Sequence, residues 1–259
     1  MSFLMLALAL SAFSFPLLKG LSLTHGRIQP SGFNGVSVVV GFGITAVVAA
    51  ATSPLMAVAF ILAVLMHDIG AALACRFIGH DVARVRLVPI PYFAAPRSDR
   101  HFDTALEESY VALYAPALAI APMVLCFALF HTLAAPFPAA ANIFRAAAIM
   151  IGAFNFVMLL PFLPFGGGHV VRAISEAFWP RMGTVITVFM TAAFFSAALK
   201  DGSIAMLILT GAGLQSLIHK RRQKLLTLSV NHALLVMSAY AFILCVHFTG
   251  GWWLLNSLM

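Results

Sequence analysis

The chain has 259 residues, of which 62% are hydrophobic and 9% are charged, whereas ordinary soluble domains carry about 25% charged residues. This composition excludes a soluble globular protein. The formal net charge of +7 would suit nucleic-acid binding, but no aromatic and basic patch accompanies it, and basic residues of membrane proteins collect in cytoplasmic loops. We therefore expect a membrane protein with no nucleic-acid partner.

Eight apolar runs predict an all-α polytopic membrane protein with about eight transmembrane helices. Each run approaches the roughly 20 residues that a helix needs to cross a bilayer. The first run lacks a basic segment ahead of it, so we prefer a span there, with the apolar region of a signal peptide as the alternative. The runs are 3–18, 33–51, 54–77, 107–131, 139–160, 183–199, 203–218 and 230–249.

The basic residues divide unevenly between the two sides that these spans define. The more basic side is expected to be cytoplasmic, which puts both termini on the non-cytoplasmic side. Arg145 and Lys200 fall on the less basic side. The more basic side receives Lys19, Arg27, Arg76, Arg84, Arg86, Arg97, Arg100, Arg172, Arg181, Lys220, Arg221, Arg222 and Lys224.

The longest polar stretch, about 79–106, follows the third span. Residues 82–88 alternate between apolar and polar side chains, which is typical of a strand. Pro89 and Pro91 limit such a strand to an edge or a hairpin. We therefore predict a small cytoplasmic β-hairpin loop near 80–100. No internal repeat or long linker divides the chain, so we expect a single membrane domain over 1–259.

The third span contains two adjacent ionisable residues, His67 and Asp68. Polar groups at membrane depth cost a few kcal/mol, so they are usually buried within a bundle and are often functional. A hydrogen-bonded pair that fixes helix packing is the alternative interpretation.

A second unusual segment follows Asn155, where an apolar helix meets Pro161, Pro164 and three glycines at 166–168. Irregular backbone in a membrane is tolerated inside a bundle or beside a cavity. The segment therefore predicts a turn that lines an internal space, or a helix end at which proline and glycine act as terminators.

Together with the loop between them, these segments resemble the site-2 protease family of intramembrane zinc metalloproteases over about residues 60–175. That family pairs H-E-x-x-H-A on one helix with L-D-G-G on a later one; two histidines and the aspartate hold zinc, and the glutamate is the general base. The resemblance implies a core of about 54–175 with accessory spans in 1–53 and 183–259. It assigns His67 to the first ligand position and Asp68 to the general-base position. Its substrate-binding positions are Asn155, Pro161, Pro164, Gly167 and Gly168.

The sequence departs from the family pattern at two of the three zinc ligands. Ala71 stands at the second histidine and Gly166 at the aspartate. A catalytic zinc needs three protein ligands, and Asp68 is one methylene shorter than glutamate. His169 is a possible substitute ligand. We therefore expect zinc to be weakly bound or absent.

These features predict a catalytically impaired or inactive member of the family, in a multi-pass setting such as a bacterial inner membrane. Its expected partner is a membrane-embedded protein or a transmembrane peptide. An active metalloprotease with an atypical site including His169, which would cleave transmembrane substrates, is the main alternative. A non-metal protease and a transporter using the broken helix near Pro161 and the buried Asp68 are further alternatives, although no inverted repeat supports a transporter.

Overall fold

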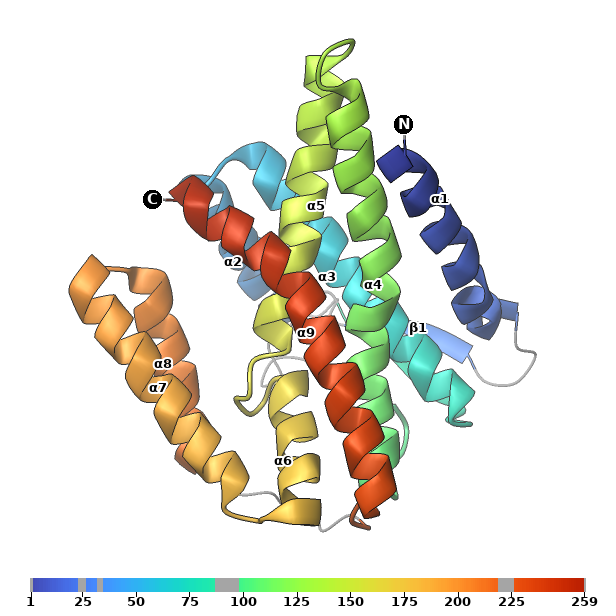
Figure 1. The fold of residues 1–259 in the computed structure, drawn as a ribbon, viewed down its shortest axis with the longest axis vertical. Coiled ribbons are helices and arrows are strands. Elements are labelled where there is room, and N and C mark those ends of the chain that lie inside the picture. Colours follow the sequence, from blue (N-terminus) through green and yellow to red (C-terminus); the bar gives the residue numbers. More distant parts are fainter. Residues whose placement is uncertain (1, 23–26, 32–34, 87–97, 219–225, 259) are drawn as a thin grey trace. The chain divides into compact units, whose positions relative to one another are not determined.

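The computed structural model describes residues 2–22, 27–31, 35–86, 98–218 and 226–258. These residues form nine α-helices, one 3-10 helix and two strands (Figure 1). In chain order the elements are α1 (Ser2–Ser14), η1 (Phe15–Ser22), β1 (Arg27–Ser31), α2 (Gly35–Ala51), α3 (Pro54–Phe77), β2 (Val82–Arg86), α4 (Ala105–Leu133), α5 (Pro138–Met158), α6 (Gly166–Phe178), α7 (Met182–Asp201), α8 (Ile204–Ile218) and α9 (Val230–Leu258).

Each of the eight predicted apolar runs is helical over most of the residues that the structure describes. Five helices are long and apolar enough to cross a membrane: α3, α4, α5, α7 and residues Val230–Trp252 of α9. The other three runs form shorter apolar helices, at Phe3–Leu18, Gly35–Ala51 and Ile204–Ile218. The chain therefore has the helices of a multi-pass membrane protein.

Local sequence signals set both ends of α3. Ser53 is the N-cap, its side chain accepts a hydrogen bond from the N–H of Met56 at 3.2 Å, and Pro54 occupies the first turn, where its missing N–H costs nothing. Gly79 has φ of 86°, and the next N–H, of His80, bonds to the carbonyl of Cys75 at 3.0 Å. This is the glycine-dependent closure of a helix C-terminus.

The chain forms two compact units, each described here by itself. The first unit contains Met1–His101, Tyr114–Val157 and Ile243–Met259, and the second contains Phe102–Leu113 and Met158–Phe242. The core of the first unit joins α3, α4 and α5 through small and flexible side chains, which let helix backbones approach closely. Its buried members include Ala59, Ala63, Ala119, Met123, Ala146, Met150 and Ile151.

Two helix crossings in the first unit depend on glycine. A Cβ at Gly70 of α3 would lie 2.9 Å from the Cα of Ala115 in α4. A Cβ at Gly152 of α5 would lie 2.7 Å from the Cα of Gly250 in α9. These backbones are too close for any side chain at either glycine.

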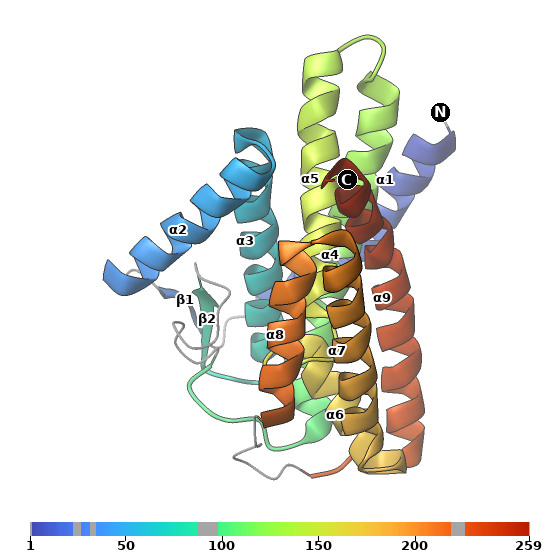
Figure 2. The same cartoon turned by 90° about the vertical axis from the view of Figure 1, so that its left-hand side faces the viewer.

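The predicted hairpin strand is present, but its strand partner is different. Strand β2 pairs in parallel with β1, with Arg27 opposite Val82 and Ser31 opposite Arg86, and the sheet lies beside α2 and α3 (Figure 2). The prediction missed β1 because its five residues include Pro30 and no apolar alternation. An antiparallel bridge between Ala83 and Ser98 also brings the loop back to β2. The tip of the predicted hairpin, with Pro89 and Pro91, lies outside the described residues.

In the second unit, α7 and α8 form a helical pair (Figure 1). The pair turns at Gly202, which has φ of 62°, and packs so closely that a Cβ at Gly213 would lie 2.1 Å from the Thr191 hydroxyl oxygen. Helix α6, which the apolar runs did not predict, buries one face containing Val170, Val171, Ala173 and Ile174. Its opposite face is more polar, so no continuous apolar run marks it.

Candidate functional site

His67 lies in α3 with 3% of its surface exposed. Its Nδ1 is 2.8 Å from Oδ1 of Asn155, which comes from α5. The imidazole also meets the edge of the Phe154 ring, with ring centroids 5.5 Å apart and planes at 88°. The structure thus brings together two residues that the sequence analysis selected separately.

The hydrogen bonds of Asn155 determine the tautomer of His67. The Nδ2 group of Asn155 donates to the carbonyl of Ile151 at 2.8 Å, so Oδ1 faces His67. An amide oxygen only accepts, so Nδ1 of His67 carries a proton. In the neutral imidazole Nε2 then carries the lone pair, as in histidines that bind metals through Nε2.

Asp68 forms a buried ion pair with Arg86 of β2. Its Oδ2 accepts from the backbone N–H of Arg86 at 2.9 Å and from Nε of the same residue at 3.3 Å. The two side chains are 3% and 8% exposed. Asp68 therefore joins the long apolar helix α3 to the sheet.

Ala71, at the second histidine position, is buried with 1% exposure. Its methyl group has no lone pair, so it cannot coordinate a metal. Gly70 beside it is in backbone contact with α4. This stretch of α3 therefore packs a helix interface.

The glycine triplet forms the first turn of α6 in the second unit. A Cβ at Gly167 would lie 1.9 Å from the carbonyl oxygen of Leu159, and one at Gly168 would lie 2.4 Å from the carbonyl carbon of Phe162. At Gly166 the nearest atoms would be 3.5 Å away, which is ordinary contact. Gly167 and Gly168 are thus required by the preceding turn, whereas Gly166 is not.

The segment between α5 and α6 turns back over itself and is held by side chains of the second unit. The N–H of Leu163 donates to the Ser216 hydroxyl at 2.8 Å. The carbonyl of Pro161 accepts from the Thr187 hydroxyl at 3.3 Å. Pro164 follows a cis peptide bond. Here the irregular backbone predicted from the prolines is confirmed, and buried hydroxyl groups form hydrogen bonds with some of its N–H and carbonyl groups.

His169 interacts with a carboxylate. Its Nδ1 is 2.9 Å from Oε1 of Glu108, which lies in the first turn of α4 within the same unit. The His169 side chain is 38% exposed. Its role as a substitute zinc ligand stays a prediction.

The donors present do not fit a catalytic zinc. Of the three positions that the resemblance assigns to ligands, His67 alone has a donor atom. Across the described ranges, no three His, Cys, Asp or Glu side chains are grouped so that they could hold one ion. One imidazole is insufficient for the three-ligand site that zinc catalysis requires.

Comparisons with protein-family models, curated proteins and solved structures found no match to this chain. The site residues that the sequence analysis missed are Arg86, as the partner of Asp68, and Glu108, as the partner of His169. Arg86 carried one available signal, because a buried aspartate requires a cation and β2 follows α3 closely.

Proposed function

We propose that this chain is a site-2-protease-like integral membrane protein that binds a transmembrane segment of a partner without cleaving it. The proposal rests mainly on the burial and the hydrogen bonds of Asp68, which stands at the general-base position. Its Oδ2 accepts two hydrogen bonds from Arg86, and the residue is 2% exposed. A general base must lie within hydrogen-bond reach of the water it activates, whereas the Asp68 carboxylate is hydrogen-bonded to Arg86 of strand β2.

The replaced ligands support the same proposal. Ala71 and Gly166 supply no donor atoms, and His67 is held by Asn155 in a packed core. The helix and the glycine turn of the family are kept, while the groups that would activate water are lost. A protein with this frame retains a means of recognising transmembrane segments.

An apolar groove in the first unit offers a place for such a segment. Its volume is about 350 Å³, and Met66 and Ile69 of α3, which flank His67 and Asp68, contribute to its wall. Two hydroxyls, of Ser11 and Ser14, are bonded to carbonyls of their own helix. The remaining wall residues are Phe15, Leu18, Leu118, Ala119, Ala121, Pro122 and Leu125. This lining suits the apolar side chains of a transmembrane helix.

The proposal includes eight membrane crossings, with both termini on the non-cytoplasmic side. Strands β1 and β2 pair in parallel along their whole length, so the chain enters both strands from the same side of the bilayer. The segment between them contains α2 and α3. A chain that returns to the same side crosses an even number of times, so if α3 crosses, the shorter α2 crosses as well.

The same argument applies to α8. Thr104 forms a bridge with Leu226, and the N–H of Ala105 bonds to the carbonyl of Leu226 at 3.0 Å. Between these two segments lie α4, α5, α7 and α8, together with the amphipathic α6. If α4, α5 and α7 cross, α8 must cross to give an even number.

Zinc content tests the loss of catalysis. We expect less than stoichiometric zinc in the detergent-purified full chain by elemental mass spectrometry, and the same low content in His67→Ala. Near-stoichiometric zinc that is lost in His67→Ala, together with cleavage of a transmembrane substrate, would overturn the proposal in favour of an atypical metalloprotease.

Photo-crosslinking tests the binding role. A photoreactive residue replacing Ile69, at the groove, should capture an uncleaved membrane protein in cells. The matched control replaces Val58, which lies on α3 outside the groove and is 64% exposed. Equal capture at both positions would show that the groove has no selective partner.

A further inference from the structure

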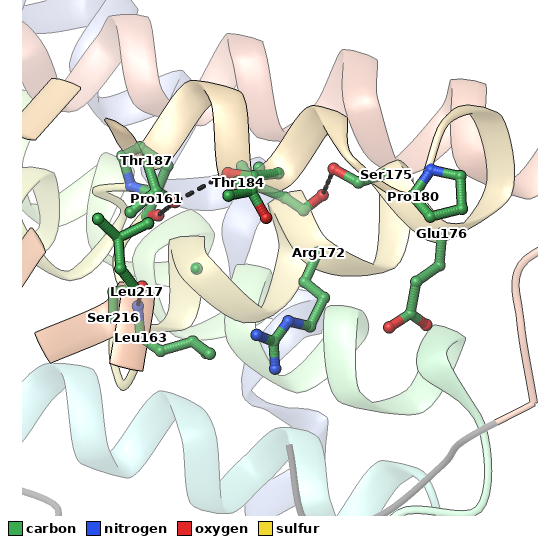
Figure 3. Close-up of a pocket in the computed structure, with 13 residues that line it drawn as sticks. Pro161, Leu163, Arg172, Ser175, Glu176, Pro180, Thr184, Thr187, Ser216 and Leu217 are labelled. Carbon is green, nitrogen blue, oxygen red and sulfur yellow. Dashed lines mark hydrogen bonds between the residues drawn. The ribbon is translucent and has the colours of Figure 1, made fainter. Parts of the chain in front are cut away.

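A second pocket lies wholly within the second unit and has a lining of both polar and apolar residues (Figure 3). Its volume is about 240 Å³, which is below the roughly 300–1,000 Å³ of sites for drug-sized ligands. Helix α6 supplies Gly168, Val171, Arg172, Ser175 and Glu176; the other wall residues are Pro161, Leu163, Pro180, Gly183, Thr184, Thr187, Ser216 and Leu217. This space suits a small polar group.

The pocket contains one side chain of each charge. Arg172 and Glu176 are four residues apart on α6, so they share one face of the helix, and both are half-buried. In Figure 3 their charged groups extend from α6 on the same side. Arginine has five N–H donors in a planar fork, which suits phosphate, and the glutamate oxygens accept from N–H donors.

Two of the three buried hydroxyls in the wall offer the pocket acceptors rather than donors; the third, of Ser216, accepts from the N–H of Leu163. The Ser175 hydroxyl donates to the carbonyl of Val171 at 2.6 Å. The Thr187 hydroxyl donates to the carbonyl of Gly183 at 2.8 Å and approaches that of Pro161 at 3.3 Å. Because each hydroxyl has a single hydrogen, what each has left to offer is lone pairs. Together with Glu176 they favour a ligand with N–H donors.

If α7 and α8 cross the membrane, the pocket lies near the membrane surface, because it is at the ends of both helices. Gly183 and Thr184 are in the first turn of α7, a 20-residue helix with the length of a span. Ser216 and Leu217 are in the last turn of α8. The ends of spanning helices lie at the level of lipid headgroups.

We infer that this pocket binds a zwitterion composed of a phosphate and a primary ammonium, with the phosphate on Arg172 and the ammonium on Glu176 and the hydroxyl oxygens. The headgroup of phosphatidylethanolamine and free phosphoethanolamine share this chemistry. The inference does not depend on whether the groove of the first unit binds a partner.

The acceptor-rich wall makes a discriminating prediction about the ammonium. An ethanolamine ammonium has three N–H donors, whereas a choline group has none and cannot hydrogen-bond to Glu176 or to the hydroxyls. A phosphatidylglycerol headgroup offers a phosphate to Arg172 but has no ammonium group to interact with Glu176. Phosphatidylethanolamine should therefore bind more tightly than either lipid.

Native mass spectrometry of the detergent-purified full chain tests this order. The protein is titrated with phosphatidylethanolamine, phosphatidylcholine and phosphatidylglycerol of identical acyl chains, and separately with soluble phosphoethanolamine. We expect phosphatidylethanolamine to bind at least about tenfold more tightly than phosphatidylcholine, as the loss of one charge-assisted hydrogen bond implies. Displacement of the lipid by millimolar phosphoethanolamine would assign the site to a free ligand of the same chemistry.

Three variants with matched controls locate the site. Arg172→Gln and Glu176→Gln should each weaken phosphatidylethanolamine binding about tenfold, whereas Lys200→Gln and Asp201→Asn, at the other end of α7, should not. Gly183→Leu should block the pocket, because a Cβ there already lies 3.0 Å from the Ser175 oxygen. Gly211→Leu is its control, since a Cβ at Gly211 meets nothing within 4 Å.

The results separate clearly. Selective binding that is lost in the pocket variants and kept in the controls supports the inference. Equal binding of the three lipids overturns it, as does a preference for phosphatidylethanolamine that survives Arg172→Gln, Glu176→Gln and Gly183→Leu.

Discussion

Three consecutive glycines at the start of α6 differ in how much space surrounds them. Added Cβ atoms at Gly167 and Gly168 would come within 1.9 Å and 2.4 Å of backbone atoms. At Gly166 the same atom would have ordinary contacts at 3.5 Å. Because backbone cannot rotate away as a side chain can, the second and third glycines are structural requirements of this turn.

We expect Gly167→Ala and Gly168→Ala each to lower the free energy of unfolding by at least about 1–3 kcal/mol, the usual cost of overpacking. The matched control Gly166→Ala should change it far less. Thermal unfolding in detergent, followed by circular dichroism, measures all three variants. Equal unfolding midpoints for Gly166→Ala and Gly167→Ala would contradict the backbone contact.

Candidate site residues could be recognised from the sequence where the residue type and its immediate neighbours were sufficient evidence. His67 and Asp68 were recognisable because a polar group in an apolar helix is costly, and Asn155 was singled out through the family resemblance. Their partners were harder to predict, because they depend on the packing of distant segments: His67 and Asn155 are separated by 88 positions in the sequence. The mutual hydrogen bond that fixes the His67 tautomer required the structure.

At the scale of elements, the ion pair between Asp68 and Arg86 links α3 to β2. Breaking a buried pair by removing one partner leaves a charge in a dry interior, which costs about 3–5 kcal/mol. Replacing both partners with apolar residues of similar size is often neutral or stabilising. We therefore expect the effects of substitutions at Asp68 and Arg86 on the free energy of unfolding to be non-additive.

Arg86→Met should destabilise the protein by up to about 3–5 kcal/mol, and the double variant Arg86→Met with Asp68→Leu should recover only part of that loss, because Asp68 also accepts a hydrogen bond from the backbone N–H of residue 86. Chemical unfolding of Arg86→Met, Asp68→Leu and the double variant in detergent gives a double-mutant cycle. Additive effects of the two substitutions would show that the side chains do not stabilise each other.

The loop that returns to β2 should respond to acid through Asp99. The Val82 N–H donates to its Oδ1 at 3.2 Å, and this hydrogen bond is the main cause that lowers the pKa of Asp99 below its ordinary 3.8. A lowered pKa in the folded state stabilises the fold above the unfolded value, and this stabilisation is lost as the pH falls through the folded value.

The difference in thermal midpoint between the parent protein and Asp99→Asn should therefore be largest above pH 3.8 and should shrink below it. Midpoints measured in detergent from about pH 6 downward test this linkage. Asp201→Asn, at the exposed end of α7, controls for the loss of one carboxylate. A difference that grows as the pH falls would reverse the sign of the effect.

The elements were predictable where one property dominates a whole segment. Long apolar runs predicted the helices from α1 to α5 and from α7 to α9, because crossing a bilayer demands length and apolarity together. Strand β1 and helix α6 were missed. Strand β1 pairs with a segment about fifty residues later, and α6 is amphipathic beside a packed turn. Both depend on tertiary contacts that local patterns do not record.

For the whole molecule, the number of crossings depends on the short helices. The paired segments β1 with β2, and Thr104 with Leu226, place α2 and α8 among the spans if their longer neighbours cross. The uneven distribution of basic residues then predicts that the side carrying the sheet is cytoplasmic. These two arguments are independent, because one rests on hydrogen bonding and the other on charge.

Cysteine labelling in intact cells separates the two arguments. In a chain with Cys75, Cys126 and Cys245 replaced by alanine, Lys200→Cys should react with a membrane-impermeant maleimide. Asp103→Cys and Leu226→Cys should react only after permeabilisation, because the segments around them are paired with each other and the excess of basic residues predicts that their side is cytoplasmic. Labelling of Leu226→Cys on the same side as Lys200→Cys would mean that α8 does not cross. If Asp103→Cys and Leu226→Cys were labelled in intact cells and Lys200→Cys were not, the number of crossings would stay the same and the orientation would be reversed. The pairing of segments constrains the number of crossings, whereas the orientation rests on charge alone.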